Sequence, residues 1–205
     1  MAGGGAGWYP AVVKAARKLA TYVDLLALPE DERAEILAGE IITMPSPLPR
    51  HNWIARSVGI FIGGPFDNDD GRGGPGGWWI IPDVDVQLRV HDVVRPDVAG
   101  WRRERLPEPW EIRPIEVRPD WVCEVLSPSN AKHDRLKKAN LYAACGVPFY
   151  WIVDPAERTL EALELRDGGW FRLGAWTDGD TQRIRPFEAI ETDVGRLFPP
   201  LPPEP

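Results

Sequence analysis

Two acidic residues, Asp97 and Glu124, stand within otherwise apolar segments of the sequence. Glu124 lies inside Trp121-Val122-Cys123-Glu124-Val125-Leu126, and Asp97 follows Pro96 and precedes Val98-Ala99. An ionised carboxylate in a buried strand is costly unless a cation or a hydrogen-bond donor compensates it. For Glu124 alone, a buried salt bridge or an exposed strand end would also be an adequate explanation.

The chain between Asp97 and Glu124 is long enough for two strands and a connection, so neighbouring strands can hold the two carboxylates side by side. Carboxylates at that distance repel one another, and a divalent cation is the usual remedy. Oxygen ligands favour Mg²⁺ or Mn²⁺ over Zn²⁺. The sequence has only three histidines and no Cys/His spacing typical of zinc, so we expect Mg²⁺ (or Mn²⁺) at Asp97 and Glu124.

A lysine on the following helix is the third candidate. The spacing predicts a helix over residues 131–145, in which Asp134, Lys138 and Tyr142 recur at helical intervals on one stripe with Ala131 and Cys145. A stripe that carries Tyr142 and Cys145 faces inward, so Lys138 is expected to point toward the protein interior. An ion pair between Lys138 and Asp134 alone is the competing interpretation.

The elements that must position these residues follow from hydrophobic periodicity. We expect helices over residues 11–27, 31–37 and 51–61, a strand over 40–44 and a long surface loop over 63–77. Strands are expected over residues 83–90, 93–101, 120–126 and 149–153, followed by antiparallel strands over 159–198. Asp83 and Asp85 are interpreted as the solvated face of their strand, and Asp154 as a turn residue that ends one.

Length, cysteine content and net charge limit the class of protein to which the chain can belong. The length of 205 residues favours one α/β domain, which we divide into an N-terminal helical extension (1–27), the domain proper (28–198) and a Pro-rich tail (199–205). Cys123 and Cys145 are expected to be free thiols, which is typical of a reducing cytoplasm. The sequence shows neither a signal pattern nor a membrane-spanning stretch, so we expect a cytoplasmic location. The net charge of −7 argues against bulk electrostatic binding of nucleic acid, although a local basic rim can coexist with it.

Taken together, these residues resemble a known superfamily. Pro96-Asp97, Glu124-Val125-Leu126 and a helix lysine resemble the PD-(D/E)XK nucleases. The run "PDVAGW … VCEVLSPSN … DRLKKANLYAACGVPFYWIVDP" is more closely similar to the bacterial Uma-type (Uma-two) endonucleases. The opening motif of that family is matched by three segments: Glu35 to Glu40, Met44-Pro45-Ser46-Pro47, and His51. The resemblance therefore covers residues 28–195.

The resemblance implies an α+β mixed sheet with a restriction-endonuclease-like core, flanking helices and a C-terminal antiparallel extension. It implies a Mg²⁺-dependent endonuclease that hydrolyses DNA, with Asp97 and Glu124 as metal ligands and Lys138 and Glu35 as further catalytic residues. Glu35 would add a ligand or orient a water, although an exposed helix acid is the commoner interpretation. His51 would bind a phosphate or stabilise a loop. A homodimer is expected, because two DNA strands must be cut.

One position departs from the superfamily pattern. The lysine expected two residues after Glu124 is replaced by Leu126, which strand alternation puts on the same face as Glu124. In the Uma-type family a helix lysine takes that place, and here it corresponds to Lys138. Two alternatives to a DNA endonuclease stay open: a catalytically inactive nuclease-fold module that binds nucleic acid or regulates, and a different metal-dependent phosphohydrolase.

Overall fold

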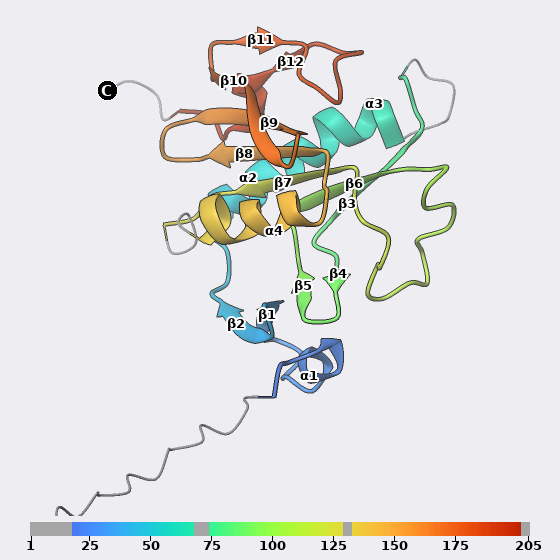
Figure 1. The fold of residues 1–205 in the computed structure, drawn as a ribbon. Coiled ribbons are helices and arrows are strands. Elements are labelled where there is room, and N and C mark those ends of the chain that lie inside the picture. Colours follow the sequence, from blue (N-terminus) through green and yellow to red (C-terminus); the bar gives the residue numbers. More distant parts are fainter. Residues whose placement is uncertain (1–17, 68–73, 129–132, 202–205) are drawn as a thin grey trace, which may run out of the picture.

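A mixed six-stranded sheet occupies the middle of the molecule (Figure 1). The computed structural model describes residues 18–67, 74–128 and 133–201. The strand order is β10-β9-β8-β7-β6-β3, in which β7 and β8 are parallel and all other neighbours are antiparallel. The strands are β3 Trp78–Pro82, β6 Val98–Arg102, β7 Trp121–Val125, β8 Phe149–Asp154, β9 Thr159–Arg166 and β10 Gly169–Thr177. The predicted mixed-sheet α/β architecture is confirmed.

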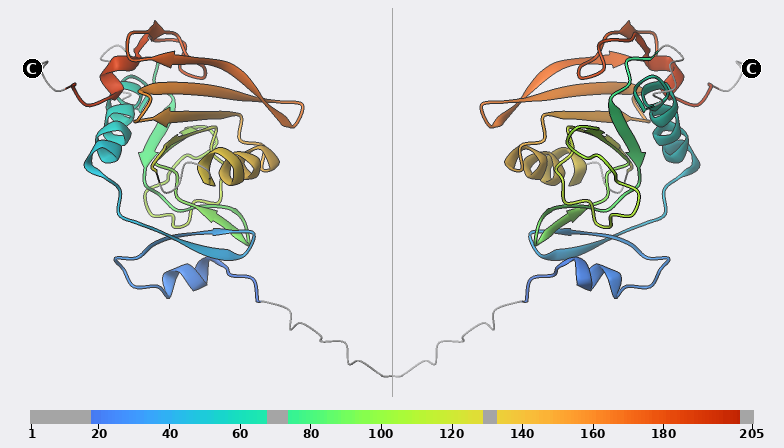
Figure 2. Two further views of the ribbon diagram at one scale, coloured as in Figure 1. Left: turned by 90° about the vertical axis from the view of Figure 1, so that its left-hand side faces the viewer. Right: turned by 90° about the vertical axis from the view of Figure 1, so that its right-hand side faces the viewer.

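Helical segments cover both faces of this sheet (Figures 1 and 2). One face carries α2 Pro49–Val58, a π-helical turn Gly59–Gly63 and α3 Gly64–Asp67, and the other carries a π-helix His133–Lys138 and α4 Ala139–Ala144. Every residue of β7 is buried, as its continuous apolar sequence predicts. Trp121, Cys123 and Val125 join the core on the α2 side, whereas Val122 and Leu126 join the core on the α4 side.

Gly100 of β6 is a tight point in this core. A methyl group at its Cα would lie 3.0 Å from both the Trp121 ring and Ile80 Cδ1. Gly100→Ala is therefore expected to lower the free energy of unfolding by about 1–3 kcal/mol, since overpacked side chains leave their preferred rotamers. Gly59→Ala, whose added methyl would meet nothing within 4 Å, is the control. Urea denaturation of both variants checks the prediction, and equal stability would contradict it.

A second, four-stranded sheet lies beside the first, with strand order β2-β1-β5-β4 (Figure 1). Its strands are β1 Arg33–Leu37, β2 Glu40–Met44, β4 Val86–Arg89 and β5 Asp92–Val94. The predicted strand over 40–44 is confirmed, but the helix predicted over 31–37 is wrong. Ala38 and Gly39, both with positive φ, form a two-residue turn that pairs β1 with β2, and β5 pairs with the other edge of β1. This pairing overrides the helix propensity of the segment.

The strand predicted over 93–101 is two strands with a break between them. β5 ends at Val94 and β6 begins at Val98, so Arg95-Pro96-Asp97 connects the two sheets. Pro96 cannot donate to a strand ladder, which favours an interruption at this point. The break matters for function because it places Asp97 at the start of β6.

Parts of other predicted elements lie outside the described residues. The helix predicted over 11–27 is described only from residue 18, where α1 spans Tyr22–Leu26. The helix predicted over 51–61 corresponds to α2 and its π-helical continuation. Residues 68–73 of the predicted loop, 131–132 of the predicted helix and 202–205 of the tail are not described.

The C-terminal part adds antiparallel strands, as predicted. β9 and β10 form a hairpin whose turn is Asp167-Gly168, and a short pair follows, comprising β11 Thr181–Gln182 and β12 Thr192–Asp193. The 3₁₀ turn Val194–Leu197 then packs into the core on the α2 side. Within the described residues, no helix is long and apolar enough to cross a membrane.

Candidate active site

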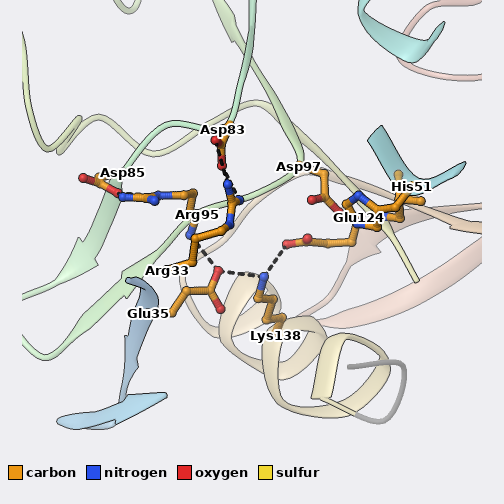
Figure 3. Close-up of polar contacts among 10 residues, drawn as sticks. Arg33, Glu35, His51, Asp83, Asp85, Arg95, Asp97, Glu124 and Lys138 are labelled. Atoms are coloured by element: carbon orange, nitrogen blue, oxygen red, sulfur yellow. Dashed lines mark hydrogen bonds and ion pairs between the residues drawn. The ribbon is translucent and has the colours of Figure 1, made fainter. Parts of the chain in front are cut away.

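Asp97, which immediately precedes β6, and Glu124, on the neighbouring strand β7, line the same pocket, whose volume is about 300 Å³. Oδ2 of Asp97 accepts a hydrogen bond from the backbone N–H of Val125 at 2.7 Å and lies 3.2 Å from Nε2 of His51. Glu124 is 2% exposed and points toward the α4 side of the sheet, where its Oε1 accepts from the Tyr142 hydroxyl at 2.6 Å. The predicted proximity of the two acids is thus present in the fold (Figure 3).

Lys138 reaches back to this pair, as the helix periodicity predicts. Its Nζ lies 2.7 Å from Oε1 of Glu35 and 3.1 Å from Oε1 of Glu124 (Figure 3). It also lies 3.7 Å from Oδ1 of Asp134. The ion pair with Asp134 therefore exists, but it is the longest of the three. Lys138 is only 2% exposed, so its ammonium group cannot serve as a solubilising charge.

The buried charges around Lys138 shift the pKa values of the lysine and of Glu124. Burial alone would lower the pKa of Lys138, but Glu124, Glu35 and Asp134 outweigh it and hold that pKa well above its ordinary value, so the lysine is charged. Burial raises the pKa of Glu124 well above its ordinary value; Lys138 opposes this, whereas the Asp97, Asp134 and Glu35 charges add to it. One ammonium group is thus shared by three buried carboxyl groups, with Asp97 nearby. A further cation would oppose the rise in the pKa of Glu124, because an opposite charge favours the ionised form.

Glu35 belongs to this cluster, although it is neither exposed nor helical as the commoner interpretation had it. It is fully buried on β1, and its Oε1 also accepts the backbone N–H of Arg95 at 2.7 Å. Its other oxygen, Oε2, is buried with no hydrogen-bond partner among the described residues. Glu35 does not line the pocket itself; it lies behind Lys138 and holds its ammonium group.

Two arginines at the pocket were not selected from the sequence. Arg33 and Arg95 both line it, together with the Met44-Pro45-Ser46-Pro47 loop of the opening motif. Arg33 lies two residues before Glu35 and therefore on the same face of β1. That alternation, in a segment recognised as a strand, is the signal that would have identified it. Both arginines are ion-paired, Arg33 with Asp83 and Arg95 with Asp85, so they offer hydrogen-bond donors at the pocket without an excess of positive charge.

His51, at the N-terminal part of α2, contacts Asp97 rather than stabilising a loop alone. Burial would lower its pKa, but the hydrogen bond and charge of Asp97 outweigh this and raise it above the ordinary value. Its other ring nitrogen, Nδ1, is buried without a partner among the described residues. Asp154, in contrast, is a turn residue as predicted, since its Oδ1 accepts from the backbone N–H groups of Ala156 and Glu157.

The donor set is suited to a hard cation. No described residue donates a hydrogen bond to Oδ1 of Asp97 or to Oε2 of Glu124. Within the described ranges, no three His, Cys, Asp or Glu side chains form a ready-made metal cage. Mg²⁺ commonly keeps several waters and is held by one or two carboxylates, so these two acids fit it in number and chemistry.

Comparisons with known proteins show the family and the fold of this chain. A protein-family model named Uma2 and described as "Putative restriction endonuclease" matches residues 19–195. The chain belongs to the Uma2 family. A crystal structure described as a "putative nuclease belonging to DUF820", from Anabaena variabilis, superposes with a TM-score of 0.69 at 20% identity, covering 87% of this chain and 97% of that one. No curated protein matches the chain.

Family membership confirms the resemblance found in the sequence, and the structural neighbour confirms the nuclease-like fold. Within this Uma2 chain, the departure at Leu126 has a clear physical reason. Leu126 is 4% exposed and packs with Val122 in the core on the α4 side, so a lysine there would have to displace core contacts. The ammonium group comes instead from Lys138, on the helical segment that covers this face.

Asp85 is buried and forms an ion pair with Arg95 of the pocket, so its interpretation as a solvated residue is wrong. Its side chain is 4% exposed and accepts hydrogen bonds from Arg95 Nε at 2.8 Å, Arg113 Nε at 3.0 Å and the Tyr22 hydroxyl at 2.9 Å. Asp83, by comparison, is half exposed and ion-paired with Arg33 (Figure 3). Asp85 thereby fixes the arginine whose backbone N–H binds Glu35.

The ionisation of Asp85 gives a pH prediction. Burial would raise its pKa, but Arg95, Tyr22 and Arg113 outweigh that effect and bring it below the ordinary value of 3.8. A carboxyl group with a depressed pKa stabilises the fold above its unfolded pKa, and this contribution is lost as the pH falls through the folded value. The Tm difference between the wild type and Asp85→Asn is therefore expected to be largest above pH 5 and to shrink toward pH 3.

Thermal melts from pH 7 to pH 3 check this expectation. The exposed Asp31→Asn provides the control, since no described residue pairs with it. A Tm difference for Asp85→Asn that stays constant over the whole range would contradict the ionic role of Asp85.

Proposed function

We propose that this Uma2-family protein is a Mg²⁺-dependent (or Mn²⁺-dependent) endonuclease that hydrolyses phosphodiester bonds of DNA. The observation that carries the proposal is the contact between Lys138 Nζ and Glu124 Oε1 at 3.1 Å, at a pocket that Asp97 also lines. Two acids and a lysine at one pocket are the functional groups that metal-assisted phosphodiester hydrolysis requires.

Each residue has a distinct part in this proposal. Asp97 and Glu124 would hold the cation, which when bound supplies charge neutralisation and an acidified water. Lys138 would stabilise the charge that develops on the phosphate oxygens, and its burial keeps that charge effective because little water screens it. Glu35 is a positioning residue: it holds the Lys138 ammonium group at 2.7 Å. Arg33 and Arg95 would bind phosphate at the pocket rim.

Several finer features stay predictions. DNA as the substrate is supported by the family description of a restriction endonuclease, and a homodimer is proposed because two strands must be cut. A cytoplasmic location is supported by Cys123 and Cys145, which are both free. Sedimentation of the purified chain would test the dimer directly.

A binding module without turnover is the second candidate. It is favoured by the three carboxylates that surround Lys138, because an ammonium group paired with all three is less available to a substrate phosphate. A cleavage assay separates the two functions. The endonuclease proposal predicts that supercoiled plasmid and a labelled oligonucleotide are cut in Mg²⁺ or Mn²⁺ and left intact in EDTA. Binding without cleavage under either metal would favour the module instead.

A further inference from the structure

The outer face of α2 combines exposed cationic and aromatic side chains beside the catalytic pocket. We propose that this face, formed by Arg50, Trp53 and Arg56, binds a single-stranded DNA segment that flanks the scissile phosphate. The inference rests on the proposed nuclease function and specifies its substrate: DNA that is unpaired next to the cleavage position.

The surface along α2 is continuous with the catalytic pocket. A second cavity of about 470 Å³ shares Arg33, Pro47, His51 and Asp97 with it. This second cavity continues along α2, where Asn52, Ala55, Arg56 and Gly59 line it. Of the proposed face, Arg56 lines this cavity and Trp53 lies beside Arg56, so a strand whose phosphate lies at Asp97 would pass Arg56 and meet Trp53 at the edge of the cavity.

The arginines of this α2 face differ in charge compensation from most others in the protein. Most arginines of this acidic protein are neutralised by a carboxylate, as Arg33 is by Asp83 and Arg95 by Asp85. Arg50 and Arg56 are exposed, and neither has a carboxylate partner within the part of the chain that the structure describes. Uncompensated guanidinium groups about 1.7 turns apart on a helix, roughly 9 Å along its axis, suit phosphates of a nucleic-acid backbone.

Trp53 gives this face an exposed aromatic ring that a nucleobase could contact. Trp53 is 43% exposed, and the Arg56 guanidinium lies 5.7 Å from the centroid of its ring. An exposed indole beside a guanidinium group offers a stacking surface for a nucleobase, and this mode is common among proteins that bind single strands. Bases within a duplex are already stacked on one another, so Trp53 selects for unpaired nucleotides.

The test measures binding by fluorescence anisotropy, with a labelled 12-nucleotide single strand and the corresponding duplex in Ca²⁺. The wild type is expected to bind the single strand more tightly than the duplex. Trp53→Ala should weaken single-strand binding about tenfold, whereas Trp53→Phe should retain most of it. Arg56→Gln should reduce the slope of log affinity against log salt by about 0.7, the share of one phosphate contact.

Two substitutions outside this face serve as controls. Trp110→Ala removes another exposed tryptophan, which packs against Trp79 outside both cavities, and Arg183→Gln removes an exposed arginine of the C-terminal region. Both should bind like the wild type. Unchanged binding by Trp53→Ala, or tighter binding of the duplex, would overturn the inference. Failure of the nuclease proposal is recognised separately, as an absence of cleavage in Mg²⁺ and Mn²⁺.

Discussion

Replacement of Lys138 by methionine is expected to lower the free energy of unfolding by about 3–5 kcal/mol, the cost of removing one partner from a buried ion pair. The substitution leaves Glu35, Glu124 and Asp134 buried without their shared ammonium group. Methionine has a similar volume, so a cavity contributes little to the loss. Urea denaturation at pH 7 measures the effect.

Lys137, the neighbour of Lys138 on the same helical segment, provides a matched control. Lys137 is exposed, and Lys137→Met should change stability by less than about 0.5 kcal/mol. A second variant tests the electrostatic origin of the effect. Adding Glu35→Gln to Lys138→Met removes one of the uncompensated charges and should restore part of the lost stability. If the double variant is less stable than Lys138→Met alone, the carboxylates are not what Lys138 compensates.

Substitution of Asp97 by asparagine is expected to reduce the rate of Mg²⁺-dependent cleavage by about 10³-fold. Asparagine can still accept the hydrogen bond from the Val125 N–H, so the fold should be preserved. What it loses is the negative charge that would bind the cation, and metal-derived stabilisation of the transition state is worth several kcal/mol. Single-turnover cleavage of a labelled oligonucleotide gives the rate.

Asp154→Asn is the control for this loss. Asp154 ends β8, and its Oδ1 accepts two backbone hydrogen bonds that asparagine can also accept, so its substitution should leave cleavage unchanged. Cleavage that survives Asp97→Asn at the wild-type rate would point to a contaminating nuclease rather than to this site.

The sequence predicts the central part of the site because strong local patterns carry it. Glu124 is conspicuous within five buried residues of β7, and the spacing of Asp134, Lys138 and Tyr142 places the lysine on the inner face of its helix. Strand alternation likewise predicts that Leu126 shares a face with Glu124. These inferences need only the periodicities of a strand and a helix.

The remaining parts depend on contacts between distant segments, which local patterns do not contain. Glu35 lies in a segment of good helix formers, and only its pairing with β2 and β5 makes it a strand. Asp85 alternates with apolar residues as a solvated strand would, yet Arg95, Arg113 and Tyr22 converge on it from three other segments. A single sequence gives no sign of such convergence.

Calorimetric titration of the protein with Mn²⁺ tests directly whether Asp97 and Glu124 hold a divalent cation. The wild type is expected to bind Mn²⁺ at one site, and Asp97→Asn and Glu124→Gln should each abolish or severely weaken this binding. Absence of binding by the wild type, or equal binding by the wild type and Asp97→Asn, would contradict the assignment.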